Sequence, residues 1–319
     1  MIEPLMTMIG AVDIGGTKIA VGIVDEDGHL LYRMEAPSSA VEAYADGLRL
    51  ITDMLWDAAR ATGIAITGIG IGSTGPVFPF AGRFGDLDFL PRWSGESLVD
   101  DLAQEFHLPV ALENDADAAA LAEASWGAGR SKSRLIYVTV GTGIGGGIIF
   151  DGQLYRGVDA AHPEIGHQVI DMSGPLCSCG LCGCWESLAA GPAMAKWMVS
   201  QPECSKRNEL TAIRICELAL AGDALALRTV EREAFYLGLG LANLVNLFTP
   251  DAVLLSGSVM KSASLFLEGI GKVMRQGCRF VPLEKAELKL ASLGEDANLI
   301  GAARAWHYRF AQDGKHVCQ

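Results

Sequence analysis

Short apolar runs followed by helical spacing organise the first third of the chain. Three apolar runs, broken by glycine or turn residues, predict a β-meander at residues 8–14, 19–24 and 30–34. Apolar positions three and four residues apart then predict a helix that begins after Ser39 and ends at Gly63. Further strands are expected at 64–71 and 109–112, and a further helix at 94–107.

The rest of the chain repeats the theme of a glycine-broken hairpin. Apolar runs at 135–140 and 146–150 predict two strands around a glycine loop, after an alanine-rich helix at 116–124. Because both parts of the chain contain such a hairpin, two related half-domains that flank a cleft are expected. The remaining expected elements are helices near 187–199, 208–221, 223–247 and 297–310 and strands at 252–255 and 288–293.

The composition is that of a folded protein whose negative charge repels polyanions. The 319 residues are 50% hydrophobic and 20% charged, and 25 basic against 38 acidic side chains give a formal net charge of −13. Such a field repels nucleic acid and anionic membrane, so neither is expected as a partner. No apolar stretch approaches the roughly 20 residues of a membrane span, and no leader-like start precedes the first strand. A cytoplasmic location is therefore expected.

The first hairpin carries the groups that a phosphate needs. Gly15 and Gly16 lack a Cβ, so their amides allow close approach of an anion, and Thr17 and Lys18 add a hydroxyl and a cation. Asp13, at the end of the first strand, is expected to hold Mg²⁺ through water. The same residues also fit a tight hairpin that happens to contain two glycines, so this segment alone leaves both interpretations open.

A second glycine loop shifts the balance toward phosphate. Residues 141–147 hold five glycines in seven positions between two apolar strands, which is more than a turn needs. Thr142, Gly143 and Gly145 are the candidate phosphate contacts. No Gly-Lys-Ser/Thr follows, and no G-x-G-x-x-G pattern opens a helix at either loop. These absences argue against a Walker loop and against a nicotinamide cofactor.

A cluster of cysteines follows a histidine in the second half. Cys177, Cys179, Cys182 and Cys184 lie together, and the first of them comes ten positions after His167. In a cytosolic protein such a cluster indicates a metal, and three thiolates with one imidazole make a closed tetrahedral zinc site of the structural kind. We assign Cys177, Cys179, Cys184 and His167 to zinc and leave Cys182 out. The alternative is a four-cysteine site that frees His167.

These motifs resemble those of a known family. The two glycine loops are similar to the phosphate hairpins of the sugar kinase, heat-shock protein and actin superfamily, in which one hairpin from each lobe grips ATP. The segment from His167 to Glu186 resembles the zinc motif of the ROK family (repressors, open reading frames and kinases) at all of its positions. Gly257 and Ser258 resemble the turn that holds adenosine in this superfamily, with an ordinary strand-to-helix turn as the alternative. The resemblance covers nearly the whole chain.

The resemblance also implies roles around a sugar. Asp115 would be the general base that accepts the proton of the sugar hydroxyl as it attacks the γ-phosphate. A helix N-cap is the ordinary alternative for Asp115. His167 would bind zinc with one ring nitrogen and the sugar with the other. Hydrogen bonds to the sugar hydroxyls would come from Asn114, the backbone near Gly75, Glu164, His167 and Glu186.

The implied fold is α/β, a two-lobed actin-like ATPase (ribonuclease H-like) fold with ATP and sugar in the interlobe cleft. Residues 1–113 plus 296–319 would form the smaller lobe and residues 114–295 the larger one. The implied activity is ATP-dependent phosphorylation of a hexose or N-acetylhexosamine at the 6-hydroxyl, with glucose first and N-acetylmannosamine or N-acetylglucosamine next. ATP, Mg²⁺ and structural Zn²⁺ are the implied cofactors, and a homodimer or homotetramer is the common assembly of the family.

Two questions stay open at this point. His162, Pro163 and Glu164 replace the Ala-Gly-Glu of many ROK glucokinases and resemble some fructokinase-type members, whereas the cysteine spacing is that of the glucokinase and N-acetylmannosamine kinase type. The rival class is a ROK repressor, but such repressors resemble this chain only after an N-terminal helix-turn-helix, and the first hairpin here begins by residue 13. A sugar sensor without catalysis is a third possibility, against which Asp115 and the complete glycine loops argue.

Overall fold

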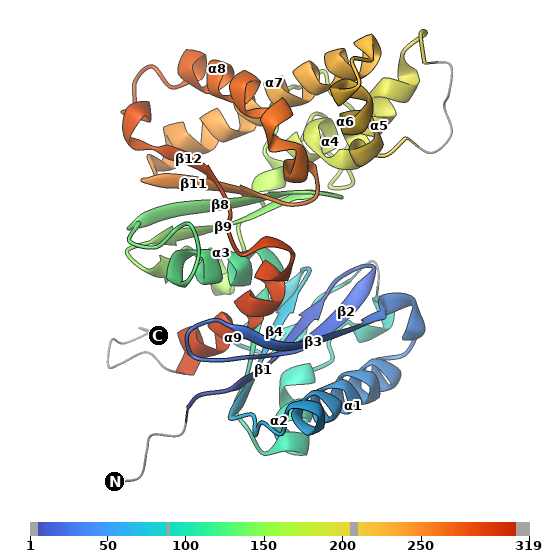
Figure 1. The fold of residues 1–319 in the computed structure, drawn as a ribbon, viewed down its shortest axis with the longest axis vertical. Helices are drawn as coiled ribbons and strands as arrows, with labels where there is room; N and C mark the ends of the chain where they lie inside the picture. The colour runs from blue at the N-terminus through green and yellow to red at the C-terminus, as the bar shows by residue number, and fades with distance from the viewer. Residues whose placement is uncertain (1–5, 88–89, 205–209, 311–319) are drawn as a thin grey trace. The chain divides into compact units, whose positions relative to one another are not determined.

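The computed structural model describes residues 6–87, 90–204 and 210–310. The described residues form two compact units (Figure 1), the first within residues 6–131, 153–163 and 292–310 and the second within residues 132–152 and 164–291. The expected boundary after residue 113 differs from this division. Helix α3 (Asp115–Ser125) belongs to the first unit, because it packs along α9 (Ala297–Phe310). Residues 311–319, expected in the smaller lobe, lie outside the described residues.

The first unit is built on a five-stranded sheet. Its order is β3 (Leu30–Pro37), β2 (Lys18–Val24), β1 (Ile9–Ile14), β4 (Gly68–Ser73) and β7 (Val110–Asn114). Strand β1 pairs antiparallel with β2, which is the expected hairpin, and β1, β4 and β7 run parallel. The carboxyl ends of these three parallel strands therefore meet at one edge of the sheet.

Alternation along the strands divides the core of this unit between the two faces of the sheet. Val12 on β1 packs in the cluster that includes α1 (Tyr44–Thr62) and α2 (Leu98–Phe106), whereas Ala11 packs in the cluster of α9. Helix α9 lies very close to β4, since a Cβ at Gly70 would meet the carbonyl oxygen of Ala302 at 1.9 Å. Glycine at position 70 is thus required for this approach.

The second unit repeats the arrangement of hairpin and parallel strands. Its sheet has the order β9 (Ile144–Phe150), β8 (Arg134–Val140), β11 (Ala252–Ser256) and β12 (Glu287–Leu290). Strands β8 and β9 pair antiparallel around the second glycine loop, and β11 runs parallel to both β8 and β12. Figure 1 shows α7 and α8 side by side on this sheet. The helices are α4 (Trp185–Ala189), α5 (Gly191–Ser200), α6 (Ala212–Leu220), α7 (Ala224–Phe248) and α8 (Leu267–Gly277).

Some boundaries differ from the sequence-based expectation. The single helix expected at 187–199 is two helices, because Ala190 is extended (φ −84°, ψ 161°) and Pro192 lies in the first turn of α5, where proline is favoured. Strand β4 begins at Gly68 instead of residue 64. Residues 208–209 of the helix expected at 208–221 lie outside the described residues, and α6 follows its cap at Thr211. The short strands are β5 (Val77–Phe78), β6 (Arg83–Phe84) and β10 (Gln153–Leu154).

Candidate functional site

The ends of β4 and β7 place a carboxylate and a hydroxyl together in the first unit. Ser73 pairs with Asn114 at the last position of these parallel strands, so the residues that follow each strand emerge side by side. The hydroxyl of Thr74 donates a hydrogen bond of 2.9 Å to Oδ2 of Asp115. Gly75 lies beside Asn114, because a Cβ on this glycine would be 3.3 Å from the Asn114 amide nitrogen. The structure thus brings Gly75, Asn114 and Asp115 together, as predicted.

Asn114, and not Asp115, is the N-cap of helix α3. Its side-chain oxygen accepts from the amides of Ala116 at 2.9 Å and Asp117 at 3.2 Å. Asn114 is buried, whereas Asp115 keeps part of its surface exposed. The alternative interpretation of Asp115 as the cap is therefore wrong, and its carboxylate sits in the first turn, where the helix dipole favours a negative charge.

Burial and a second carboxyl group govern the protonation of this site. Burial raises the pKa of Asp115, while the hydrogen bonds from Thr74 and from the Ala116 amide act in the opposite direction. Burial first, and then the nearby charge of Asp115, raise the pKa of Asp13 at the end of β1 to about 7. Two carboxyl groups that hinder each other's ionisation suit a site that holds a cation, because a divalent ion would favour both charged forms.

The first hairpin exposes the predicted phosphate groups. Gly15 donates from its amide to the carbonyl of Lys18 at 3.0 Å, which closes the turn, and Gly16 and Thr17 are exposed at its tip. Lys18 does not point freely outward, since its ammonium pairs with Glu35 at 3.1 Å. Both partners of this ion pair are about two-fifths exposed, so the pair is weak and an anion could compete for Lys18.

In the second unit the glycine loop is bound by Glu186. The carboxylate of Glu186 accepts from the amide of Ile144 at 3.0 Å. A Cβ at Gly143 would lie 2.3 Å from the same carboxylate oxygen, so a side chain there would displace Glu186 from its present position. Thr142 is exposed at the tip of the loop and Gly145 is half-buried behind it. The predicted sugar contact Glu186 therefore also supports the predicted phosphate loop, a role that the sequence did not reveal.

The predicted adenosine turn lies against the same loop. Gly257 has φ +95°, and a Cβ there would meet the carbonyl oxygen of Val140 at 2.3 Å. A Cβ at Gly141 would lie 3.5 Å from the hydroxyl of Ser258. The Gly257–Ser258 turn and the 141–147 loop thus form one continuous surface at the carboxyl ends of β8 and β11, which the sequence could predict only through the resemblance.

Four of the predicted metal ligands converge in the second unit. The ligand atoms of His167, Cys177, Cys179 and Cys184 all lie within 4.8 Å of one another. Nδ1 of His167 is 3.4 Å from Sγ of Cys177, and the thiols of Cys179 and Cys184 are 3.5 Å apart. Zinc–sulfur bonds of about 2.3 Å in a tetrahedron place neighbouring ligand atoms about 3.8 Å apart, so this donor set fits Zn²⁺. Cys182 is exposed and outside the group.

The remaining predicted sugar contacts lie next to this cluster. The short helix η4 (Ile165–His167) packs on the glycine loop, since a Cβ at Gly166 would be 2.0 Å from the carbonyl of Ile144. Glu164 precedes this helix and is exposed. Glu164, His167 and Glu186 therefore come together within the second unit, and Gly75, Asn114 and Asp115 within the first.

The family model of the ROK family matches residues 9–309, which is nearly the whole chain. The chain belongs to the ROK family. A glucokinase of Halalkalibacterium halodurans is 33% identical over 313 residues, with 91% of this chain and 92% of the relative covered. Among solved structures, a ROK hexokinase from Thermus thermophilus has a TM-score of 0.85 at 33% identity and covers 96% of this chain and 100% of its own.

A second ROK structure carries ligands. The ROK family glucokinase of Streptomyces griseus, solved with glucose and AMPPNP, has a TM-score of 0.78 at 33% identity over 93% of this chain and 98% of its own. These likenesses confirm the expected two-lobed actin-like fold. Xylose repressors are also relatives, and the matched region covers 53% to 76% of their length. Among the described residues no helix is long and apolar enough to cross a membrane.

Two contacts of buried carboxylates near the ROK site residues could not be predicted from the sequence. Glu113, next to Asn114, binds both terminal nitrogens of Arg156, and one of these bonds measures 3.0 Å. Asp117 is fully buried, and Nδ1 of His162 lies 2.9 Å from its carboxylate. A carboxylate in a helix of alanines was the one available signal for Asp117, whereas nothing in the sequence pairs Arg156 with Glu113.

Proposed function

We propose that glucose is the preferred substrate of this ROK-family, ATP-dependent sugar kinase and that its 6-hydroxyl accepts the phosphate. N-acetylmannosamine, N-acetylglucosamine and fructose are the alternative sugars. The observation that carries the proposal is the state of Asp115: its neighbour Asn114 caps the helix, Thr74 orients its carboxylate, and the residue keeps part of its surface exposed. A general base needs this combination of fixed orientation and access.

In the proposed reaction the 6-oxygen of the sugar attacks the γ-phosphorus of ATP. The bond to the bridging oxygen breaks, ADP leaves with that oxygen, and the proton of the hydroxyl goes to the carboxylate of Asp115. The glycine amides and Thr17 and Thr142 of the two loops would bind and align the phosphates. Mg²⁺, when bound, neutralises charge on the phosphate oxygens, and Asp13 would hold it through water.

We propose that the zinc site affects sugar binding only by holding the ring of His167 in one orientation. With Nδ1 of His167 directed at the thiolates, Nε2 remains for a sugar hydroxyl. Zinc would then fix the tautomer and the orientation of this ring, which is the usual effect of a metal on its histidine ligand. Glu164 and Glu186 would accept hydrogen bonds from neighbouring sugar hydroxyls. Glu186 would at the same time support the phosphate loop by accepting a hydrogen bond from the Ile144 amide.

The choice of glucose rests on the relatives and on the cysteine spacing. Glucokinases about one-third identical cover more than nine-tenths of this chain. The His162-Pro163-Glu164 segment is the feature that favours fructose, and His162 is tied to Asp117 rather than free to meet a substrate. Because His162 lies against the buried Asp117, its presence is compatible with a pyranose as well as a furanose.

Release of ADP is the measurement that tests this proposal. The protein, loaded with zinc, is assayed with Mg²⁺ and ATP against glucose, mannose, fructose, allose, N-acetylglucosamine and N-acetylmannosamine. We expect glucose to give the highest kcat/KM, with the product identified as the 6-phosphate by ³¹P NMR. A higher kcat/KM for another sugar overturns glucose. If no sugar causes ADP release although glucose binds in calorimetry, the protein would instead be a sugar sensor or a repressor core.

A further inference from the structure

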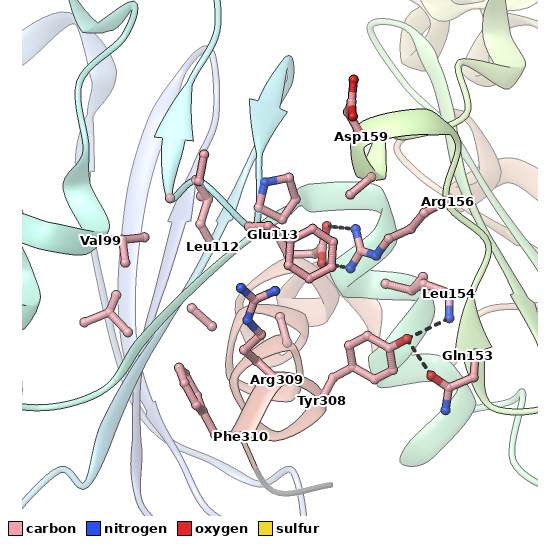
Figure 2. A pocket seen from close by; sticks show the side chains of 18 of the residues that line it. Val99, Leu112, Glu113, Gln153, Leu154, Arg156, Asp159, Tyr308, Arg309 and Phe310 are labelled. Carbon is pink, nitrogen blue, oxygen red and sulfur yellow. Dashed lines mark hydrogen bonds and ion pairs between the residues drawn. The ribbon is translucent and has the colours of Figure 1, made fainter. Parts of the chain in front are cut away.

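A cavity of about 800 Å³ lies in the first unit (Figure 2). Strand β7, the end of α9, residues 79–82 and residues 153–160 line it. Its volume is that of sites for small organic ligands. None of the residues assigned above to ATP, sugar or zinc lines this cavity, so the proposed reaction does not explain it.

Two arginines flank one aromatic ring at this cavity. The guanidinium carbon of Arg309 lies 4.2 Å from the centre of the Phe80 ring, and that of Arg156 lies 5.5 Å from the same centre. Figure 2 shows both guanidinium groups directed into the pocket. Phe80 is 52% exposed, so part of this aromatic residue remains open to a ligand.

The two arginines differ in what neutralises them. Arg156 is 14% exposed and is bound by both oxygens of Glu113. For Arg309, no carboxylate of the described residues lies within ion-pair distance. Burial, and then the positive charge of Arg156, lower the pKa of Arg309, while the charge of Glu113 acts in the opposite direction. Arg156 is thus paired directly with a carboxylate, whereas Arg309 interacts with Glu113 only at longer range and can bind an anion.

The acidic groups at the rim do not fill this role. Figure 2 shows the carboxylate of Asp159 pointing away from both guanidinium groups. Asp100, in the first turn of α2, also lines the cavity and is exposed, and no ion pair joins it to Arg309 among the described residues. The neutral polar groups of the lining are bonded to one another: Tyr308 accepts from the amide of Leu154 at 3.2 Å and donates to Gln153 at 2.9 Å. The cavity thus combines the Arg156–Glu113 pair, a second guanidinium without a described ion-pair partner, two exposed carboxylates, and neutral and apolar lining residues.

We propose that this cavity is a binding site for a small organic anion, a phosphate monoester or a polycarboxylate. The guanidinium of Arg309 binds the anionic group through paired N–H donors, and Phe80 and Leu112 contact the organic part of the ligand. The site adjoins the strand that ends at Asn114, because Glu113 on that strand binds Arg156 in the same cavity. An anion bound here therefore contacts the ion pair that supports the residue preceding Asp115.

Calorimetry with defined anions tests this proposal. Phosphoenolpyruvate and succinate represent the two sources of charge, and succinamide is the neutral analogue of succinate. The titrations use the zinc-loaded full chain at low ionic strength without Mg²⁺ and with ADP at saturation, so that the glycine loops are occupied. We expect at least one anion to bind with a Kd below about 1 mM, and succinamide to bind at least about tenfold more weakly than succinate.

Variants at Arg309 assign the binding to this cavity. Arg309→Gln removes an exposed charge that no described carboxylate pairs, so the fold is expected to remain, and Arg309→Glu repeats the test with the charge reversed. Both are expected to weaken the anion at least about tenfold. Arg60→Gln, an exposed arginine of α1 outside the cavity, should leave the Kd unchanged. Any of three results would overturn the proposal: neither anion binds, the anion binds both Arg309 variants as tightly as the wild type, or succinamide binds as tightly as succinate.

Discussion

The hydroxyl of Thr74, which follows β4, donates a hydrogen bond of 2.9 Å to the carboxylate of Asp115, which follows the parallel strand β7. This bond holds the carboxylate in one orientation, and it favours the charged form that burial disfavours. Since Asn114 satisfies the free amides of helix α3, Asp115 does not have to cap the helix. Asn114 thus caps the helix and Thr74 orients Asp115, so the carboxylate of Asp115 is left for the proposed chemistry.

Asp115→Asn is expected to lower kcat by about 10²- to 10⁴-fold, because the amide cannot accept the proton of the attacking hydroxyl. The affinity for the sugar should change by less than about threefold, since the amide retains the shape and one acceptor of the carboxylate. Steady-state kinetics and calorimetry measure the two effects. Asp57→Asn, an exposed residue of α1, is the matched control. Activity close to that of the control would remove Asp115 from the role of base.

Thr74→Val removes the hydrogen-bond donor and should raise the pKa of Asp115 further. A base works only when it is ionised, so activity is lost as the pH falls through its pKa, and a higher pKa moves this loss to higher pH. We expect the acidic limb of the kcat/KM profile to move up by about 0.5–1 pH unit, the equivalent of one hydrogen bond. Thr74→Ser keeps the hydroxyl and should keep the wild-type profile. A limb that stays in place, or moves down, contradicts the assignment.

Cys179→Ser is expected to reduce bound zinc from about one ion per chain to below about 0.2, because three ligands hold a structural zinc poorly. Loss of the metal should also lower the melting temperature, since an ion held by these four residues would link η4 to the start of α4. Metal content by mass spectrometry and thermal melts measure both effects. Cys182→Ser, outside the cluster, should keep its zinc. Zinc retained in Cys179→Ser but lost in Cys182→Ser would favour the other ligand set.

Local patterns in the sequence predicted much of this fold. The hairpins at the two glycine loops are confirmed, because two short apolar runs joined by glycine-rich residues favour paired strands. The convergence of His167, Cys177, Cys179 and Cys184 could be predicted because these residues lie close together in the sequence, and zinc at this cluster stays a prediction. The start of β4 was wrong by four residues, since Ile64 and Ile66 continue the apolar pattern although the strand pairs only from Gly68.

The contacts that tune the site could not be predicted in this way. Thr74 and Asp115 are 41 residues apart, and Glu113 and Arg156 are 43 apart. No periodicity connects such positions, so a threonine after a strand and an arginine in a loop resemble ordinary surface residues in the sequence. Glu186 was predicted as a sugar contact only, because its bond to the Ile144 amide depends on how the zinc segment packs on the glycine loop.

Glu186→Gln should separate the two contacts of this side chain. The glutamine oxygen can still accept from the Ile144 amide, so the KM for ATP should change by less than about twofold, while the KM for the sugar should rise about tenfold or more with loss of the charged acceptor. Glu186→Ala removes both contacts, and both KM values should rise. If ATP and sugar weaken equally in Glu186→Gln, the sugar does not meet this carboxylate.

Glu233 on α7 offers a test of stability against pH. The side chain is fully buried, and neither carboxylate oxygen has a hydrogen-bond partner in the described part of the chain. Burial raises the pKa of Glu233 to about 8, with the charge of Arg232 acting in the opposite direction. The folded state therefore holds the proton that the unfolded chain releases near pH 4.5, and stability falls as the pH rises from there through 8.

Glu233→Gln is expected to remove this penalty. At pH 9 the variant should melt about 3–6 °C above the wild type, the equivalent of about 1–2 kcal/mol in a domain of this size. At pH 4.5 and below, where the carboxyl group is protonated in the folded chain, the two should melt together. Glu231→Gln, an exposed neighbour on the same helix, controls for the change of net charge. A stabilisation that is the same at both pH values, or present only at the lower one, would show that Glu233 is ionised in the folded chain.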